Sequence, residues 1–89
     1  MIWSITFSRN GLKSFDKVDK GAQKRIRHYL ELKVAPDPTA LGEAMVGDKK
    51  GYWRYRVGDY RVIVKIFHGE LMVLVVQVGK RGDVYRAKL

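Results

Sequence analysis

The amino-acid sequence predicts an α+β fold in which two helices pack on one face of a mainly antiparallel sheet. Three observations predict it: an alternating segment at the start, helical spacing of apolar residues after it, and three later apolar segments joined by tight turns. The expected order is an N-terminal strand, two helices and a three-stranded antiparallel meander. Eighty-nine residues are expected to form a single domain, residues 1–89.

The first strand is expected at residues 2–7, where apolar and polar side chains alternate. Side chains two residues apart share one face of a strand. Trp3, Ile5 and Phe7 therefore share one face, while Ile2, Ser4 and Thr6 share the other. This pattern is typical of a half-buried strand.

Two helices are expected next. Ser8 or Asn10 offers an N-cap oxygen to the first helix, and Asp19 offers one to the second. The apolar residues that define their inner faces are Leu12, Phe15 and Val18 in the first, and Ala22, Ile26, Tyr29 or Leu30, and Val34 in the second. Pro36 and Pro38 end the helical part of the chain.

The antiparallel meander is expected to fill residues 52–78. Residues 52–57 and 60–67 flank Gly58-Asp59, a pair suited to a two-residue hairpin turn. His68-Gly69 is expected to form a second tight turn. Residues 71–78 are almost continuously apolar, which predicts a central strand buried on both faces.

Arginines alternate with aromatic residues in the first strand of this meander. Arg54 and Arg56 should share one face, and Trp53, Tyr55 and Val57 the opposite, buried face. A folded surface of guanidinium groups with tyrosine nearby suits phosphate and unpaired bases. The pattern therefore favours RNA as the partner.

The composition agrees with a polyanionic partner. Eighteen Lys and Arg against nine Asp and Glu give a net charge of +9, and the hydrophobic fraction of 46% is typical of a packed globule. A basic surface that is merely solvated is the alternative. No cysteine, spanning segment or signal peptide is present, so we expect a cytoplasmic protein without contact to a membrane.

Two segments resemble a known family. Residues 53–62 (WRYRVGDYRV) and 78–85 (VGKRGDVY) are similar to motifs of the RelE/ParE superfamily of toxins, and most closely to RelE-type messenger-RNA interferases. The resemblance implies a type II toxin that enters the ribosomal A site and cuts messenger RNA there, with the RNA 2′-hydroxyl as nucleophile. It also implies a cognate antitoxin protein. No His, Asp or Glu cluster has metal-ligand spacing, so neither a metal nor a cofactor is expected.

The resemblance also implies residue roles. Arg61 becomes a phosphate clamp, Arg81 a group that stabilises the phosphorane, and Tyr85 a ring that stacks on an A-site base and orients the 2′-hydroxyl. An ion-paired Arg61, a solvated Arg81 and a Tyr85 packed on the sheet edge are the alternatives. Arginine is effectively always charged, so charge stabilisation by Arg81 is favoured over proton donation.

Other cations have less specific expectations. Arg54 and Arg56 stand where RelE proteins carry lysines, one of them a proposed general base. Arginine cannot take that role, so they are expected to bind RNA. The base is then Tyr85, a ribosomal group or a solvent group, or the chemical step is slow. Two further groups of cations are expected either to contact RNA or to be simply solvated. They are Lys80, Lys49 and Lys50, and, on the second helix, Lys24, Arg25, Arg27 and Lys33. His28 and His68 lie outside both motifs.

Two rival functions stay open at this point. One is a ParE-like toxin that inhibits DNA gyrase without cutting nucleic acid, and the other is a nucleic-acid-binding module without chemistry. Arg61, Arg81 and Tyr85 together argue against the first rival, and the absence of a usual base keeps the second. The sequence leaves open the codon preference, the identity of the antitoxin, the oligomeric state of the complex and any binding of the toxin–antitoxin pair to operator DNA.

Overall fold

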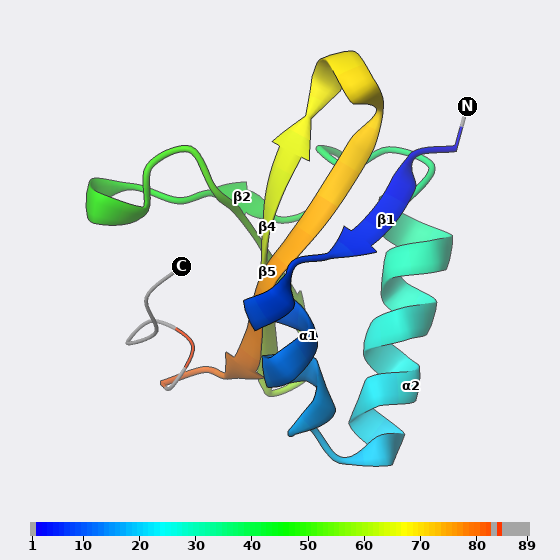
Figure 1. Cartoon of the computed structure of the whole chain (residues 1–89), viewed down its shortest axis with the longest axis vertical. Coiled ribbons are helices and arrows are strands. Elements are labelled where there is room, and N and C mark those ends of the chain that lie inside the picture. Colours follow the sequence, from blue (N-terminus) through cyan, green and yellow to red (C-terminus); the bar gives the residue numbers. More distant parts are fainter. Residues whose placement is uncertain (1, 83, 85–89) are drawn as a thin grey trace.

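Five strands form one sheet in the computed structural model of the chain, which describes residues 2–82 and 84 (Figure 1). They are β1 (Ser4–Phe7), β2 (Glu43–Ala44), β3 (Trp53–Val57), β4 (Tyr60–Phe67) and β5 (Met72–Lys80). Their spatial order is β1-β5-β4-β3-β2. The apolar strand β5 therefore lies inside the sheet, as the sequence predicts, but it is not buried on both faces as expected: one face is only half-buried.

The sheet is mixed, which corrects the antiparallel expectation. β3, β4 and β5 form the predicted antiparallel meander. β1, however, pairs with β5 in parallel, with Ser4 opposite Met72. Alternation shows which side chains share a face, but it carries no information on the direction of the neighbouring strand. β2 was not predicted either, because two residues are too few to show a period.

The two helices begin where the sequence predicts. α1 (Arg9–Asp16) is capped by Ser8, whose Oγ accepts a hydrogen bond of 3.0 Å from the Gly11 N–H. α2 (Lys20–Tyr29) is capped by Asp19, whose Oδ2 accepts a 3.2 Å hydrogen bond from the Ala22 N–H. These side chains satisfy N–H groups that have no partner within the helix. A π-helical turn, Leu30–Val34, then extends α2 towards the prolines.

The contact between α1 and the sheet differs from the prediction. Leu12, expected on the inner face, is 50% exposed. Gly11 faces the sheet in its place, and a Cβ atom there would lie 2.0 Å from the carbonyl oxygen of Val75. Only a glycine therefore lets α1 approach β5 so closely.

The helices cover one face of the sheet, and the opposite face is only partly covered (Figure 1). The main core lies under the helices. Its largest fully buried members are Tyr55, Ile26, Leu30, Val34, Val62, Val64, Val73 and Val75. A small second cluster of Ile63, Val76 and Val84 lies apart from the main core, with Met45, Tyr52 and Leu74 packed against it. The end of the described chain thus folds back as far as the second cluster.

The turns of the meander differ from each other. Gly58 and Asp59 form the predicted two-residue turn, with Val57 opposite Tyr60 and a φ of 59° at Gly58. The second turn is longer than predicted: a 3-10 turn, His68–Glu70, is followed by Leu71 at a φ of 49°. β5 therefore begins at Met72. Within the described residues, no helix combines the length and apolar character needed to cross a membrane.

Candidate functional site

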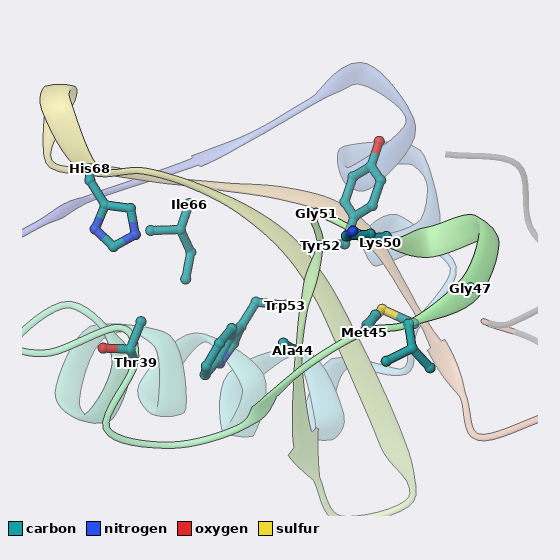
Figure 2. A pocket seen from close by; sticks show the side chains of 11 residues that line it. Thr39, Ala44, Met45, Gly47, Lys50, Gly51, Tyr52, Trp53, Ile66 and His68 are labelled. Atoms are coloured by element: carbon teal, nitrogen blue, oxygen red, sulfur yellow. The ribbon is translucent and has the colours of Figure 1, made fainter.

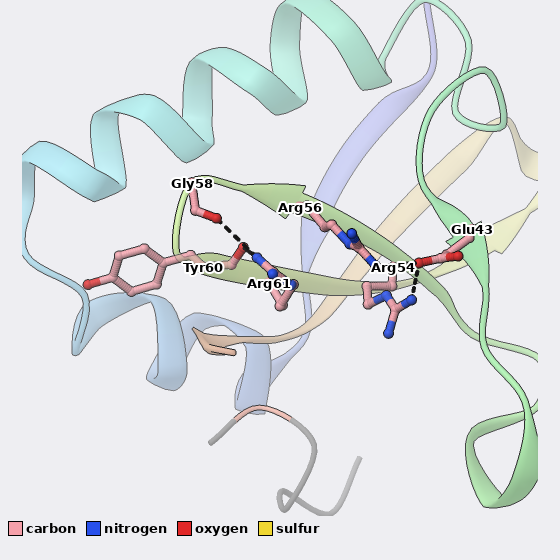
Figure 3. A network of polar contacts seen from close by, with 6 residues as sticks. All are labelled: Glu43, Arg54, Arg56, Gly58, Tyr60 and Arg61. Carbon is pink, nitrogen blue, oxygen red and sulfur yellow. Dashed lines mark hydrogen bonds and ion pairs between the residues drawn. The ribbon is translucent and has the colours of Figure 1, made fainter. Parts of the chain in front are cut away.

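Three arginines from β3 and β4 gather on one face of the sheet (Figure 3). Arg54 and Arg56 are two residues apart on β3, and Arg61 of β4 lies directly opposite Arg56 in the antiparallel register. Directly opposite residues of antiparallel strands project to the same face. Tyr55, between the two β3 arginines, is fully buried under the helices. We call Arg54, Arg56 and Arg61 the arginine row, and it lies on the sheet face away from the helices.

The Gly58-Asp59 turn holds two of the predicted catalytic residues in place. The Arg61 Nη1 atom donates hydrogen bonds of 3.0 Å to the carbonyl oxygens of Gly58 and Tyr60. On the other side of the turn, the backbone N–H of Arg81 donates a 3.2 Å hydrogen bond to the Asp59 carbonyl. The structure thus places Arg61 and Arg81 at the same end of the sheet, although they are twenty positions apart in the sequence. The Arg81 side chain is exposed.

Glu43 of β2 completes the cluster, and it was not among the predicted site residues. Its Oε1 atom forms ion pairs with Nη2 of Arg54 and, at 3.2 Å, with Nη2 of Arg56 (Figure 3). The hydrogen bond from Arg54 is the main cause that lowers the pKa of this carboxyl below its ordinary value. Its side chain is 51% exposed, so an ionised carboxylate stands beside the arginines and within reach of solvent.

The connection before β2 explains how Glu43 reaches the arginines. Gly42 has a φ of 76°, and a Cβ atom there would lie 2.3 Å from the Arg54 carbonyl oxygen. Two buried or half-buried side chains of β3 also hold this connection. The Trp53 indole N–H donates a 2.8 Å hydrogen bond to the Leu41 carbonyl, and the Tyr55 hydroxyl donates one to the Pro38 carbonyl. The one signal in the sequence that could have revealed Glu43 as a site residue is the glycine directly before it, Gly42, and this signal is weak.

The remaining predicted residues lie around this cluster or outside the described chain. Lys80 is exposed at the end of β5, opposite Tyr60. Lys49 and Lys50 belong to the segment between β2 and β3, residues 45–52, which contains the 3-10 turn Gly47–Lys49. We call this segment the arm. Tyr85 lies outside the described residues, so its role stays a prediction. The residue before it, Val84, is fully buried in the second cluster.

The basic residues of the second helix do not join the arginine row. Lys24, Arg25 and Arg27 are exposed on α2, and Lys33 is exposed on the π-helical turn. His28 is exposed on α2, while His68 packs edge-on against Trp3 with ring centroids 5.5 Å apart. No group of three potential metal ligands occurs among the described residues.

Two hollows flank the arm between β2 and β3. The larger, about 610 Å³, has walls formed by Trp53, Ile66 and His68 together with residues of the arm (Figure 2). It contains no carboxylate and none of the three arginines. The smaller, about 390 Å³, is lined by residues of the arm and by Arg54. Of these two hollows, the smaller is therefore the one continuous with the arginine row.

Comparisons with known proteins agree on one family. The family model described as the ParE toxin of the type II toxin–antitoxin system parDE matches residues 5–85. An Escherichia coli protein described as a putative RelE-like toxin is 30% identical over 88 residues, which cover 96% of this chain and 92% of that protein. Both matches extend over nearly the whole chain, and the family model includes β1 from Ile5 onwards, both helices and the arginine row.

Solved structures show the same fold at low sequence identity. A chain of the RelBE2 toxin–antitoxin complex from Mycobacterium tuberculosis superposes with a TM-score of 0.85 at 17% identity, covering 93% of this chain and 95% of that one. The isolated E. coli RelE toxin gives a TM-score of 0.73 at 20% identity, covering 94% and 92%. The YoeB/ParE toxin from Agrobacterium tumefaciens gives 0.73 at 19% identity, covering 88% and 98%.

Proposed function

We propose that this chain, which belongs to the ParE toxin family of type II toxin–antitoxin systems within the RelE/ParE superfamily, is a RelE-type toxin that cleaves messenger RNA on the ribosome. A cognate antitoxin protein is its inhibitory partner, as in the toxin–antitoxin complexes that share its fold. The family itself includes proteins named ParE and proteins named RelE, so the choice between their activities depends on the site.

The observation that carries the proposal is the arginine row with a carboxylate beside it. RNA cleavage without a metal requires cations around the phosphate and a group that takes the 2′-hydroxyl proton. Arg54, Arg56 and Arg61 supply the cations on one face, and the Arg81 backbone is held at the same end of the sheet as Arg61.

The chemical step follows from these positions. The 2′-oxygen forms a bond to the adjacent phosphorus, and the bond from phosphorus to the 5′-oxygen breaks. The products are a 2′,3′-cyclic phosphate and a 5′-hydroxyl, whose proton comes from solvent. Arg61 and Arg81 neutralise the extra negative charge of the phosphorane, which exists only near the transition state.

Glu43 is the carboxylate that pairs with the arginine row, and we propose it as the general base. Arg54 and Arg56 cannot lose a proton at neutral pH, and the two histidines lie outside the cluster. In the free protein, Glu43 offsets part of the positive charge of Arg54 and Arg56. When RNA phosphate takes over these arginines, the carboxylate loses the contacts that lower its pKa. Its pKa then returns towards the ordinary value for a glutamate when the 2′-hydroxyl arrives.

Gyrase inhibition is the second candidate, because the matching family model bears the ParE name. We expect a gyrase inhibitor to depend on an interface and not on the Glu43 carboxylate. The two functions therefore differ in the residues that matter as well as in the target.

The test compares both targets with the same purified protein. Primer extension on messenger RNA in translating ribosomes should reveal cuts within A-site codons, while a gyrase supercoiling assay should show no inhibition. Arg61→Ala should abolish the cuts. The matched control is Lys13→Ala, which removes an exposed cation from α1 and should cut normally. Inhibition of gyrase without cuts on ribosomes would overturn the proposal.

A further inference from the structure

The turn between β3 and β4 supplies three consecutive carbonyl groups to the site. The carbonyls of Gly58 and Tyr60 accept the two 3.0 Å hydrogen bonds from Arg61. The Asp59 carbonyl between them accepts the 3.2 Å hydrogen bond from the Arg81 N–H. Gly58 and Asp59 are both exposed, so the turn has little packing of its own. A contact outside the turn is therefore required to fix the carbonyls that hold Arg61.

Tyr60 makes that contact. It is the neighbour of Arg61 on β4, and neighbouring side chains of a strand point to opposite faces of the sheet. Tyr60 accordingly packs against the main core on the helix face, and Figure 3 shows its ring extending away from Arg56 and Glu43. Its hydroxyl donates a 3.2 Å hydrogen bond to Oδ1 of Asp19. The turn is thereby tied to the start of α2.

Asp19 is a well-fixed acceptor for this hydrogen bond. Its Oδ2 atom caps α2, and its carbonyl accepts a 2.9 Å hydrogen bond from the Gln23 N–H in the first turn of the helix. Val18, the residue before it, is buried in the main core. The hydrogen bond from the Ala22 N–H is the main cause that lowers the pKa of Asp19. Tyr60 therefore donates to an ionised carboxylate, which is a stronger acceptor than a neutral group.

We propose that Asp19 and Tyr60 are positioning residues for Arg61. Their hydrogen bond fixes the turn against α2, and the carbonyls of the turn then hold the guanidinium of Arg61 in the arginine row. This inference rests on the proposed function, because a fixed Arg61 serves to stabilise the phosphorane. A donor that is already in place gives more stabilisation than one that must be ordered near the transition state. A hydrogen bond that only stabilises the fold is the competing outcome of the test.

The first experiment is single-turnover cleavage on programmed ribosomes. Tyr60→Phe keeps the ring and removes the donor. Its plateau rate should fall roughly tenfold to a hundredfold with a nearly unchanged half-saturating concentration, because Arg61 is misplaced but still present. Asp19→Ser keeps an oxygen that can cap α2 and removes the acceptor for Tyr60, so it should cause the same loss. The double variant should be no slower than either single variant.

Two variants serve as controls. In Asp19→Asn the side-chain oxygen can cap α2 while the amide donates to the Tyr60 hydroxyl, so cleavage should return nearly to the wild-type rate. Tyr52→Phe removes a tyrosine hydroxyl from the arm and leaves the turn intact, so it should cut as wild type. A loss in Asp19→Asn equal to that in Asp19→Ser would overturn the link between Asp19 and Tyr60.

The second experiment needs no ribosome. Nitrogen-15 NMR relaxation of the free protein gives an order parameter for the Nε–H group of Arg61. Tyr60→Phe and Asp19→Ser should both lower this order parameter, because the carbonyls of the turn are no longer fixed. Asp19→Asn and Tyr52→Phe should keep the wild-type value.

The outcomes separate this inference from the proposed function. A wild-type protein that cuts no messenger on ribosomes would refute the proposed function, and the order parameter of Arg61 would still decide whether the link holds it. A protein that cuts, but whose Tyr60→Phe variant keeps the wild-type plateau rate and order parameter, would refute the positioning role alone. A lower melting temperature of Tyr60→Phe with an unchanged order parameter of Arg61 would overturn positioning in favour of a purely structural role.

Discussion

Replacement of Glu43 by glutamine should separate binding from chemistry. Glutamine keeps the size of the side chain and removes the charge and the basicity. In the structure, one carboxylate oxygen contacts both Arg54 and Arg56, so the variant leaves these guanidinium groups more available to phosphate. Messenger binding should therefore tighten. The cleavage rate should fall by roughly 100- to 10,000-fold, the usual contribution of a general base.

The stability of the protein should hardly change in this variant. The Glu43 side chain is 51% exposed, and ion pairs at such positions contribute little to the free energy of unfolding. A loss of activity in Glu43→Gln could then not be attributed to unfolding. The melting temperature, measured by circular dichroism, should stay near that of the wild type.

The assay is single-turnover cleavage on programmed ribosomes over a range of toxin concentrations. The plateau rate reflects chemistry and the half-saturating concentration reflects binding. Glu31→Gln, an exposed change on the π-helical turn, is the matched control and should behave as wild type. A wild-type plateau rate for Glu43→Gln would refute the base assignment. Weaker binding with an unchanged plateau would instead mean that Glu43 only holds the arginines in place.

Three further predictions concern the surrounding residues. Arg61→Ala and Arg81→Ala should each slow single-turnover cleavage roughly 100- to 1000-fold, and wild-type rates in both would contradict the site. Arg56→Ala should reduce the slope of log binding constant against log salt by about 0.7, measured by ribosome binding; an unchanged slope would argue against a phosphate contact. Tyr55→Phe should lower the free energy of unfolding in urea by about 1 kcal/mol, because the Pro38 carbonyl loses its donor. Burial raises the pKa of Tyr55 in the folded protein, so the unfolded wild-type chain ionises first as the pH rises. The difference in unfolding free energy between wild type and Tyr55→Phe should therefore be complete below about pH 10 and narrow at higher pH. A difference that stays constant at higher pH would contradict this.

Local chemistry made much of the fold predictable from the sequence. The caps at Ser8 and Asp19 and the Gly58-Asp59 turn depend on a few neighbouring residues, so their positions could be predicted directly. The parallel pairing of β1 could not, because it depends on contacts between distant segments. β2 could not either, since its two residues are held in place by the close approach of Gly42 to β3.

The candidate site, like the fold, was predictable from the sequence only where it depends on neighbouring residues. The shared face of Arg54 and Arg56 follows from the period of a strand, and the two-residue turn brings Arg61 opposite Arg56. Glu43 lies eleven residues before Arg54 in a segment without a strand pattern, so only the folded chain shows that they meet. The candidate base therefore depends on tertiary structure, which is why the sequence alone left that role unassigned.

The central claim is that this protein uses the 2′-hydroxyl of ribosome-bound messenger RNA to cut the adjacent phosphodiester. The most direct measurement uses programmed ribosomes whose messenger carries a single 2′-deoxynucleotide on the 5′ side of the expected cut. Our account predicts that the unmodified messenger is cut to a 2′,3′-cyclic phosphate and a 5′-hydroxyl, and that the deoxy-substituted messenger stays intact at that position. Cleavage of both messengers at equal rates would contradict the account.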